Sequence, residues 1–366
     1  GQPSAGWGGI PDFVVEIRDP RFFTRVLSEG SLGLGECYMD GGFVLQQGTL
    51  QDFLTVLCRN RIDRAIRGDL KLALKVLGIR LVNRLRGGMK NVQSHYDIGD
   101  DLFESFLDPT MAYSCGYAEN EDDALETMQR NKFDRICRKL ALKPGERLLD
   151  IGCGYGGLLL YAAKHYGVLG YGVTTSKHHC ARGQVNAEKA GLGGRVRIEF
   201  GDYRRVEGTF DKIVSVGMME HLRPKEFSSY FQVIARALTG EGRGLVHAIG
   251  CNAAVLEHDP FIQKYIFPGS GQPKLSEIAQ QLEKNSLPIL DVENMIRHYA
   301  YTAQHWLNNF QENRGRLDAS RYDERFCRMW EYYLCAGVAA SWASDSALYQ
   351  VLFCRDAAAP LALHRV

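Results

Sequence analysis

One stretch decides the fold of this chain: Arg147-Leu148-Leu149-Asp150-Ile151-Gly152-Cys153-Gly154-Tyr155-Gly156-Gly157. A short β-prone run ends at Ile151, and four glycines then lead directly into the helix-prone residues 158–164. This order predicts a strand, a tight turn and the start of a helix. Glycines let the backbone turn sharply and let a ligand come close, and the free N–H groups at a helix start attract a carboxylate or phosphate. The stretch therefore indicates a nucleotide-like ligand.

The spacing of the glycines narrows the kind of ligand. It departs from the Gly-x-Gly-x-x-Gly pattern of dinucleotide sites. Asp150, the acidic residue before the first glycine, suits the cationic amino-acid end of a ligand better than a pyrophosphate. We interpret the loop as a site for S-adenosylmethionine, and a glycine-rich turn that binds no ligand is the alternative.

The composition is that of a globular protein large enough for two domains. The chain has 366 residues, 45% of them hydrophobic, a mean hydropathy of -0.23 and a net charge of +1. No apolar run approaches the roughly 18 residues of a membrane span, and no signal peptide is recognisable at the start. The ten cysteines form no Cys-x-x-Cys pair, so we expect reduced thiols, no zinc and a cytosolic location.

Strands and helices alternate after the glycine loop, which predicts an α/β fold with a doubly wound parallel sheet. The expected strands are 147–151, 169–174, 196–201, 210–217 and 244–249, and the expected helices are 124–140, 176–189 and 224–238. Residues 251–274 interrupt the alternation, and an insertion of this length tends to form a substrate lid or wall. Further strands are expected at 287–292 and 348–353, and helices at 299–310 and 322–336.

The N-terminal part follows a different pattern. We expect a strand at 13–17 and a helix through about Ser28, whereas the glycine-rich residues 30–42 fit no regular element. Residues 49–85 have helical periodicity. The stretch from Arg59 to Lys90 contains ten basic residues and only two acidic ones. Such a basic amphipathic stretch is typical of binding to anionic lipid headgroups, or it is a solvated helix face. Nucleic-acid binding is disfavoured because no aromatic residues are interleaved.

Ligands of an open α/β sheet bind beyond the carboxyl ends of its strands. Thr174 ends one of the expected strands, Asp202 and Glu220 follow two others, and His247 lies within a fourth. A buried histidine needs a hydrogen-bond partner. Each of these residues alone has a structural explanation, but their convergence on one crevice favours a functional site.

Several motifs, in order, resemble the cyclopropane-fatty-acyl-phospholipid synthase family and the related mycolic acid cyclopropane synthases. They are Tyr113-Ser114-Cys115, the glycine loop, residues 172–176, residues 216–221, His247-Ala248-Ile249-Gly250, residues 265–269 and 298–300. The run from Arg21 to Gly41 resembles the additional N-terminal domain of the bacterial phospholipid enzymes. The resemblance implies an accessory, lipid-binding domain at 1–90, mostly helical, and a Rossmann-like S-adenosylmethionine-dependent methyltransferase domain at 91–366.

The resemblance also implies the reaction and its site. A methylene from S-adenosylmethionine is added to the cis double bond of an unsaturated phospholipid acyl chain, and a bound bicarbonate ion is the base. The positions that match the bicarbonate ligands and catalytic residues are Cys115, Glu220, His247, Ile249 and Tyr299. Those that match cofactor-binding positions are Tyr113, Ser114, Gly152, Gly154, Gly156, Thr174, Gln184, Asp202 and Tyr203.

Other functions remain open. A methyltransferase of the same fold that makes methyl-branched fatty acids, or one that methylates a small amine, shares these motifs, and a non-enzymatic binding module is a further alternative. Cys115 is not expected to be a nucleophile because the reaction needs no covalent intermediate. We expect a peripheral protein at the inner face of the membrane, with no nucleic-acid partner and with a homodimer as one possible state.

Overall fold

The structure is a computed structural model, and it describes residues 13–61, 99–253 and 259–358. The chain divides into two compact units. The first unit consists of the described residues up to Ser105, the described residues within 257–268, and Trp306–Asp345. The second unit consists of the described residues within 106–256, Gly269–His305, and the described residues from Ser346 onward. The expected boundary at residue 90 lies outside the described residues, as does most of the basic stretch from Arg59 to Lys90.

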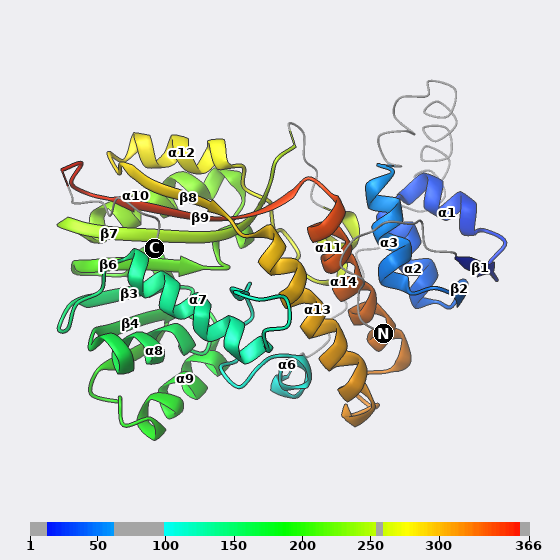
Figure 1. The fold of residues 1–366 in the computed structure, drawn as a ribbon, viewed down its shortest axis with the longest axis horizontal. Coiled ribbons are helices and arrows are strands. Elements are labelled where there is room, and N and C mark those ends of the chain that lie inside the picture. The colour runs from blue at the N-terminus through cyan, green and yellow to red at the C-terminus, as the bar shows by residue number, and fades with distance from the viewer. Residues whose placement is uncertain (1–12, 62–98, 254–258, 359–366) are drawn as a thin grey trace. The chain divides into compact units, whose positions relative to one another are not determined.

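The second unit is an α/β sheet of seven strands in the order β5-β4-β3-β6-β7-β9-β8 (Figure 1). Its strands are β3 (Arg147–Ile151), β4 (Leu169–Thr174), β5 (Val196–Phe200), β6 (Phe210–Val216), β7 (Leu238–Cys251), β8 (Ile289–Asn294) and β9 (Ser346–Cys354). Its helices are α7 (Leu125–Lys139), α8 (Gly157–Tyr166), α9 (Lys177–Lys189), α10 (Phe227–Ala237) and α12 (Leu275–Lys284). Short 3₁₀ turns are η1 (Tyr203–Arg205), η2 (Met219–His221) and η3 (Pro224–Glu226). The Rossmann-like fold expected from the sequence is confirmed.

The parallel pairing expected for the five alternating strands is confirmed, whereas the sequence analysis predicted no direction for the last strand, β9. Among the described strands of this sheet, β9 runs antiparallel to both neighbours, β7 and β8, whereas the pairs from β5 to β7 are parallel. The apolar pattern of β9 did not reveal its direction because nearly every residue of the strand is buried. A strand buried on both faces shows the same continuous apolar run in either direction.

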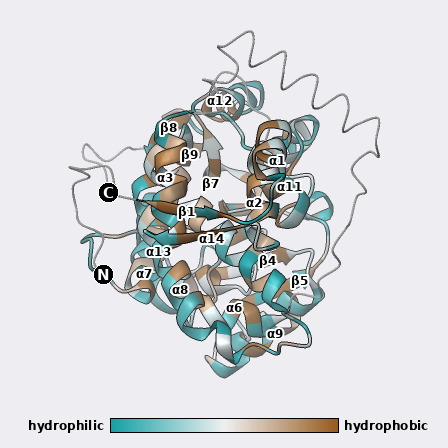
Figure 2. Cartoon of the chain, turned by 90° about the vertical axis from the view of Figure 1, so that its right-hand side faces the viewer, coloured by the Kyte–Doolittle hydropathy of each residue, from teal (hydrophilic) through white to brown (hydrophobic). Residues whose placement is uncertain are grey.

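Alternating strand residues form two cores, one on each face of the sheet. Leu148 packs with apolar residues of α7, α8 and α9, and its neighbour Leu149 packs with α10 and α12 on the other face. Figure 2 shows both hydrophilic and hydrophobic residues on α8 and α9. The strand β3 and the glycine loop after it are therefore fixed by apolar packing on both sides.

The first unit is mostly helical. It contains a two-stranded antiparallel sheet, β1 (Val14–Ile17) with β2 (Phe43–Gln47). Its complete helices are α1 (Phe22–Glu29), α2 (Ser31–Met39), α3 (Leu50–Arg59), α11 (Pro260–Tyr265) and α14 (Glu324–Ala343). It also contains most of α6 (Asp100–Phe106), the later part of α13 (Ile296–Asn313) and the 3₁₀ turn η4 (Arg314–Arg316). The glycine-rich residues that fitted no regular element form α2, where Gly33 and Gly35 allow Arg25, Phe261 and Tyr332 to approach closely.

The described helices include none that is both long and apolar enough to span a lipid bilayer. All ten cysteines are free thiols, as expected from their scattered spacing.

Candidate active site

The glycine loop lies at the carboxyl edge of the sheet, between β3 and α8. Gly152, Gly154 and Gly156 have φ angles of 83°, 53° and 79°, a region that side chains with a Cβ adopt at a cost. A Cβ on Gly152 or Gly156 would also meet Met218 or Ile198, but one on Gly154 would have no described atom within 4 Å. The loop therefore has open space at Gly154 beside the N-terminus of α8.

Asp150 provides a buried acidic group at the end of β3. It is 3% exposed, and its Oδ1 has no hydrogen-bond partner among the described residues. Burial raises its pKa to about 7, against the influence of the Lys132 ammonium. An unpaired buried carboxyl oxygen beside open space fits the ammonium group of an amino acid, which is the end of S-adenosylmethionine that the sequence predicted there.

Backbone hydrogen bonds join the loops that follow the strands. Gly152 N–H donates to Val173 O at 2.9 Å, Gly201 N–H donates to Thr174 O at 2.9 Å, and Gly217 N–H donates to His247 O at 2.8 Å. The expected convergence of these strand ends at one edge is therefore observed.

The segment carrying Tyr113, Ser114 and Cys115 is held by α7. Gln129 Nε2 donates to Ser114 O at 2.8 Å, and Lys132 Nζ donates to Ser114 Oγ at 2.8 Å and to Gln129 Oε1 at 2.6 Å. The ring of Tyr113 packs edge-on against Phe106. The buried Lys132 has its pKa lowered to about 8 by desolvation, so it carries a proton at neutral pH and places a positive charge next to this segment.

The five positions predicted to hold a small anion lie within one network. Cys115 is in an apolar cluster with Met295 and Leu348, and Ile249 and Tyr299 pack against that cluster. Ile249 N–H donates to Glu220 Oε1 at 3.3 Å. His247 precedes Ile249 by two residues on β7, and its Nδ1 lies 3.1 Å from Gln350 Nε2. The hydrogen bond expected for a buried histidine is thus present.

Two atoms of this network lack a partner. Glu220 Oε2 and His247 Nε2 are buried and make no hydrogen bond to the described residues. Burial raises the pKa of Glu220 to about 7 and lowers that of His247 well below its usual value. The protonated form of a carboxyl group and an imidazole N–H are donors that suit an oxyanion such as bicarbonate. His221, next to Glu220 in the sequence, is exposed instead.

Cys115 has the environment of a structural thiol. It is 1% exposed, and burial raises its pKa to about 12. Only the thiolate is a good nucleophile, so the thiol at neutral pH suits the expectation that no covalent intermediate forms.

Other predicted cofactor positions have protein partners of their own. Thr174 ends β4 and its Oγ1 accepts from Ser176 N–H at 3.3 Å, while Gln184 Oε1 accepts from Ile198 N–H at 3.3 Å. Asp202 accepts from Arg204 N–H at 2.9 Å at the start of η1, and the Arg204 side chain lowers its pKa. Tyr203 packs edge-on against Tyr230. Thr174, Asp202 and Tyr203 lie at or just after the ends of β4 and β5, whereas Gln184 lies in α9, and the part of all four in cofactor binding stays a prediction.

Comparison with known proteins decides the family. The family described as mycolic acid cyclopropane synthetase matches residues 83–351. The chain belongs to this family. It is an S-adenosylmethionine-dependent enzyme of the methyltransferase type.

Relatives extend over most of the chain. Cyclopropane-fatty-acyl-phospholipid synthase of Escherichia coli is 42% identical over 344 residues, which cover 93% of this chain and 87% of the relative. A probable fatty acid methyltransferase of Pseudomonas putida is 32% identical over 94% of this chain and 88% of its own length. The crystal structure of mycolic acid cyclopropane synthase CmaA1 complexed with SAH and CTAB has a TM-score of 0.67 and 29% identity, and covers 72% of this chain and 97% of its own.

Sequence reasoning missed the polar residues that support the site. Gln129, Lys132 and Lys139 lie on the buried face of α7 with Met128 and Ile136, and Gln350 lies in the buried strand β9. Their signal was a polar residue at a position where helical or strand periodicity requires an apolar one.

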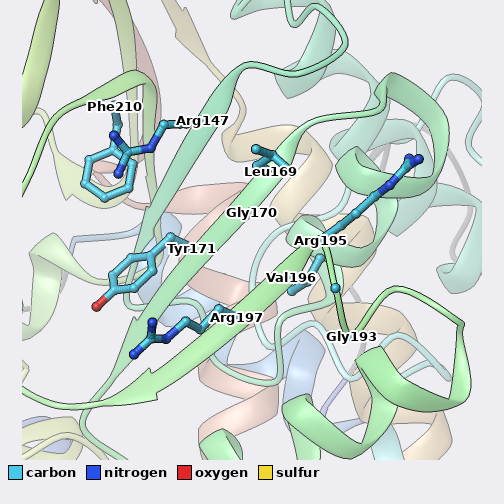
Figure 3. A pocket seen from close by; sticks show the side chains of 10 residues that line it. Arg147, Leu169, Gly170, Tyr171, Gly193, Arg195, Val196, Arg197 and Phe210 are labelled. Atoms are coloured by element: carbon cyan, nitrogen blue, oxygen red, sulfur yellow. The ribbon is translucent and has the colours of Figure 1, made fainter.

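A shallow pocket of about 340 Å³ lies at the opposite edge of the sheet. Figure 3 shows it at the first residues of the strands, where Arg147 stacks on Phe210 and where Tyr171, Arg195 and Arg197 contribute side chains. This is the amino edge of the parallel strands, so the pocket is distinct from the candidate active site.

Proposed function

We propose that the enzyme is a cyclopropane-fatty-acyl-phospholipid synthase, which adds a methylene from S-adenosylmethionine to the cis double bond of an acyl chain in a membrane phospholipid. The observation that carries the proposal is the 42% identity to the Escherichia coli enzyme of that name across 93% of this chain. Further support comes from the five candidate residues, of which Cys115, Glu220 and His247 are buried and Ile249 and Tyr299 are partly buried.

The chemistry explains why such a site is enclosed. The alkene carbon forms a bond to the methyl group as the carbon–sulfur bond breaks, and a carbocation results. Apolar residues such as Met295 and Leu348 beside Cys115 exclude water that would capture this cation. Loss of a proton from the new methyl group then lets its carbon close the ring.

Bicarbonate bound in the network would supply the base for that proton. Glu220, with its raised pKa, donates a hydrogen bond from its protonated form, and His247 and Tyr299 donate from their N–H and O–H groups. Ile249 contributes its backbone, and its N–H orients Glu220. The cation of Lys132 adds favourable potential for an anion.

The test uses the purified full chain, S-adenosylmethionine and vesicles of cis-unsaturated phospholipid. We expect cyclopropane protons in the NMR spectrum of the extracted lipid, a slower reaction after bicarbonate is removed, and loss of product in Glu220→Gln. The matched control is Glu226→Gln, which changes a partly exposed carboxylate on the same connection between β6 and α10. Full activity of carefully stripped enzyme would reject bicarbonate as the base.

A second candidate is a fatty acid methyltransferase that stops before ring closure. The probable fatty acid methyltransferase of Pseudomonas putida, 32% identical over 94% of this chain, favours it. Branched and cyclopropane products can have the same mass, so NMR distinguishes them. Without ring closure the cation loses a proton to form a branched alkene, and signals of that alkene without cyclopropane signals would replace the first proposal with the second.

A further inference from the structure

His247 belongs to a chain of buried polar side chains that leads away from the candidate active site. Its Nδ1 lies 3.1 Å from Gln350 Nε2, and Lys139 Nζ donates to Gln350 Oε1 at 2.8 Å. His247 and Gln350 are opposite each other in the pairing of β7 with β9. All three side chains are at most 4% exposed, so water cannot replace these bonds.

An ion-pair cluster fixes the position of Lys139. Its Nζ donates to Glu293 Oε2 at 2.5 Å and lies 3.7 Å from Asp291 Oδ2. Arg135 binds the same Glu293 carboxylate through two bonds of 3.0 and 2.7 Å. The lysine is therefore held at one point by two carboxylates of β8, one of which is itself fixed by Arg135 of α7.

The lysine determines how the Gln350 amide is oriented. An ammonium group has donors and no acceptor, so the atom facing it must be the amide oxygen. The amide NH₂ then faces His247 Nδ1, which has to accept the hydrogen bond. A neutral imidazole that accepts at Nδ1 carries its proton on Nε2.

We propose that Lys139 and Gln350 are positioning residues that fix His247 as the Nε2–H tautomer. His247 is then a hydrogen-bond donor to the ligand of the site, and it cannot take a proton from the reacting methyl group. The buried Nε2 without a described partner is the atom left for that ligand. The ligand atom that it meets must be an acceptor, such as an oxygen of a carboxylate or carbonate.

The charges around the His247 imidazole also favour its neutral form. Burial lowers the pKa of His247, and the cations of Lys132 and Lys139 lower it further, whereas Glu293 opposes them. The ring therefore stays neutral, and a second proton at Nδ1 would also face the donors of the Gln350 amide.

The tautomer is measured directly by NMR of the full chain labelled with ¹⁵N-histidine, with His247→Gln used to assign the signal. We expect the proton on Nε2 and no change between pH 6 and 8. In Gln350→Glu a carboxylate replaces the amide and accepts from the ring, so we expect the proton on Nδ1. A wild-type ring protonated at Nδ1, or a Gln350→Glu ring still protonated at Nε2 alone, would overturn the proposal.

A second variant tests the role of the lysine. Lys139→Met frees the amide to rotate, and we expect a mixture of both tautomers. The matched control is Lys212→Met, which removes another buried lysine, one that pairs with Glu146 at 3.6 Å; its His247 signal should equal that of the wild type. An unchanged tautomer in a folded Lys139→Met protein contradicts the role of Lys139.

The expected effect of Gln350→Glu on turnover rests on the proposed function, whereas the assignment of the His247 tautomer does not. We expect Gln350→Glu to lower kcat by about 10-fold to 100-fold, a range typical for the loss of a residue that orients a functional histidine, with little change in KM for S-adenosylmethionine. If no cyclopropane product forms in any variant, the proposed function fails, while the NMR result still decides the proposal on His247.

Discussion

Glu220 combines an ionisable group with almost complete burial. Burial raises its pKa from 4.5 to about 7. Between these pH values the folded protein keeps a proton that the unfolded chain has released. The folded state thus binds more protons there, so this residue makes the protein less stable as the pH rises through the window.

The variant Glu220→Gln removes this dependence. Near pH 4.5 its free energy of unfolding should equal that of the wild type, and by pH 7.5 the variant should be more stable by on the order of 3 kcal/mol. Urea unfolding at a series of pH values measures the difference. At Glu226 the pH dependence of stability has the opposite sign, since hydrogen bonds from Arg223 lower the pKa of this partly exposed carboxylate to about 2. If the free energies of unfolding of wild type and Glu220→Gln changed with pH in parallel, the raised pKa of Glu220 would be contradicted.

The element that organises the site is the strand, loop and helix from β3 to α8. Gly154 is suited to test the loop because an added Cβ would face open space and the strain would come from its φ of 53°. Gly191, after α9, has a φ of 69° and equally open space. In both positions an alanine in the left-handed region costs about 1–2 kcal/mol.

The two alanine variants should differ in ligand binding. We expect Gly154→Ala to bind S-adenosylmethionine at least about tenfold more weakly, which corresponds to about 1.4 kcal/mol, because its methyl group takes space that the ligand needs. Gly191→Ala should lose similar stability but keep its affinity. Calorimetric titration measures both; equal affinities would exclude the loop as the binding surface.

Helix α7 is the second organising element. Its buried face carries Gln129 and Lys132 toward the segment with Ser114, and Arg135 and Lys139 toward Glu293 on β8. Four polar residues on one buried helix face are costly to desolvate unless each is hydrogen-bonded. Their bonds make α7 a support for the candidate anion site.

At the scale of the whole molecule, segments distant in sequence combine within the first unit. Glu36 on α2 accepts from Lys264 Nζ at 2.6 Å and from Tyr265 OH at 2.8 Å on α11, and from Arg25 Nη2 at 3.0 Å on α1. The insertion after β7, expected to form a lid or wall, is thereby attached at α11 to the N-terminal helices.

Removal of Glu36 should release this attachment. In Glu36→Ala we expect faster amide hydrogen exchange in residues 259–267 and a loss of about 1–3 kcal/mol in the stability of the first unit, since a half-buried lysine and a tyrosine lose their acceptor. Mass spectrometry after exchange locates the change. The control Glu16→Ala removes an exposed carboxylate of the same unit. Unchanged exchange in 259–267 would show that Glu36 does not hold α11.

The family resemblance supplied the candidate residues Cys115, Glu220, His247, Ile249 and Tyr299, and their roles stay predictions. The sequence by itself determined the alternation of strands and helices and the glycine loop. It could do so because periodicity and turn-forming residues are local properties of the chain. The helix α2 was missed since its glycines are helical only where other helices pack closely against them.

Only the tertiary structure decided the direction of β9, the attachment of α11 to the N-terminal helices, and the pairing of His247 with Gln350. Each depends on contacts between segments that are far apart in the sequence, as His247 and Gln350 are. Such contacts are selected by burial and hydrogen bonding in the folded chain. Local sequence therefore marked the buried histidine, and the fold supplied the lysine and glutamine that set its proton.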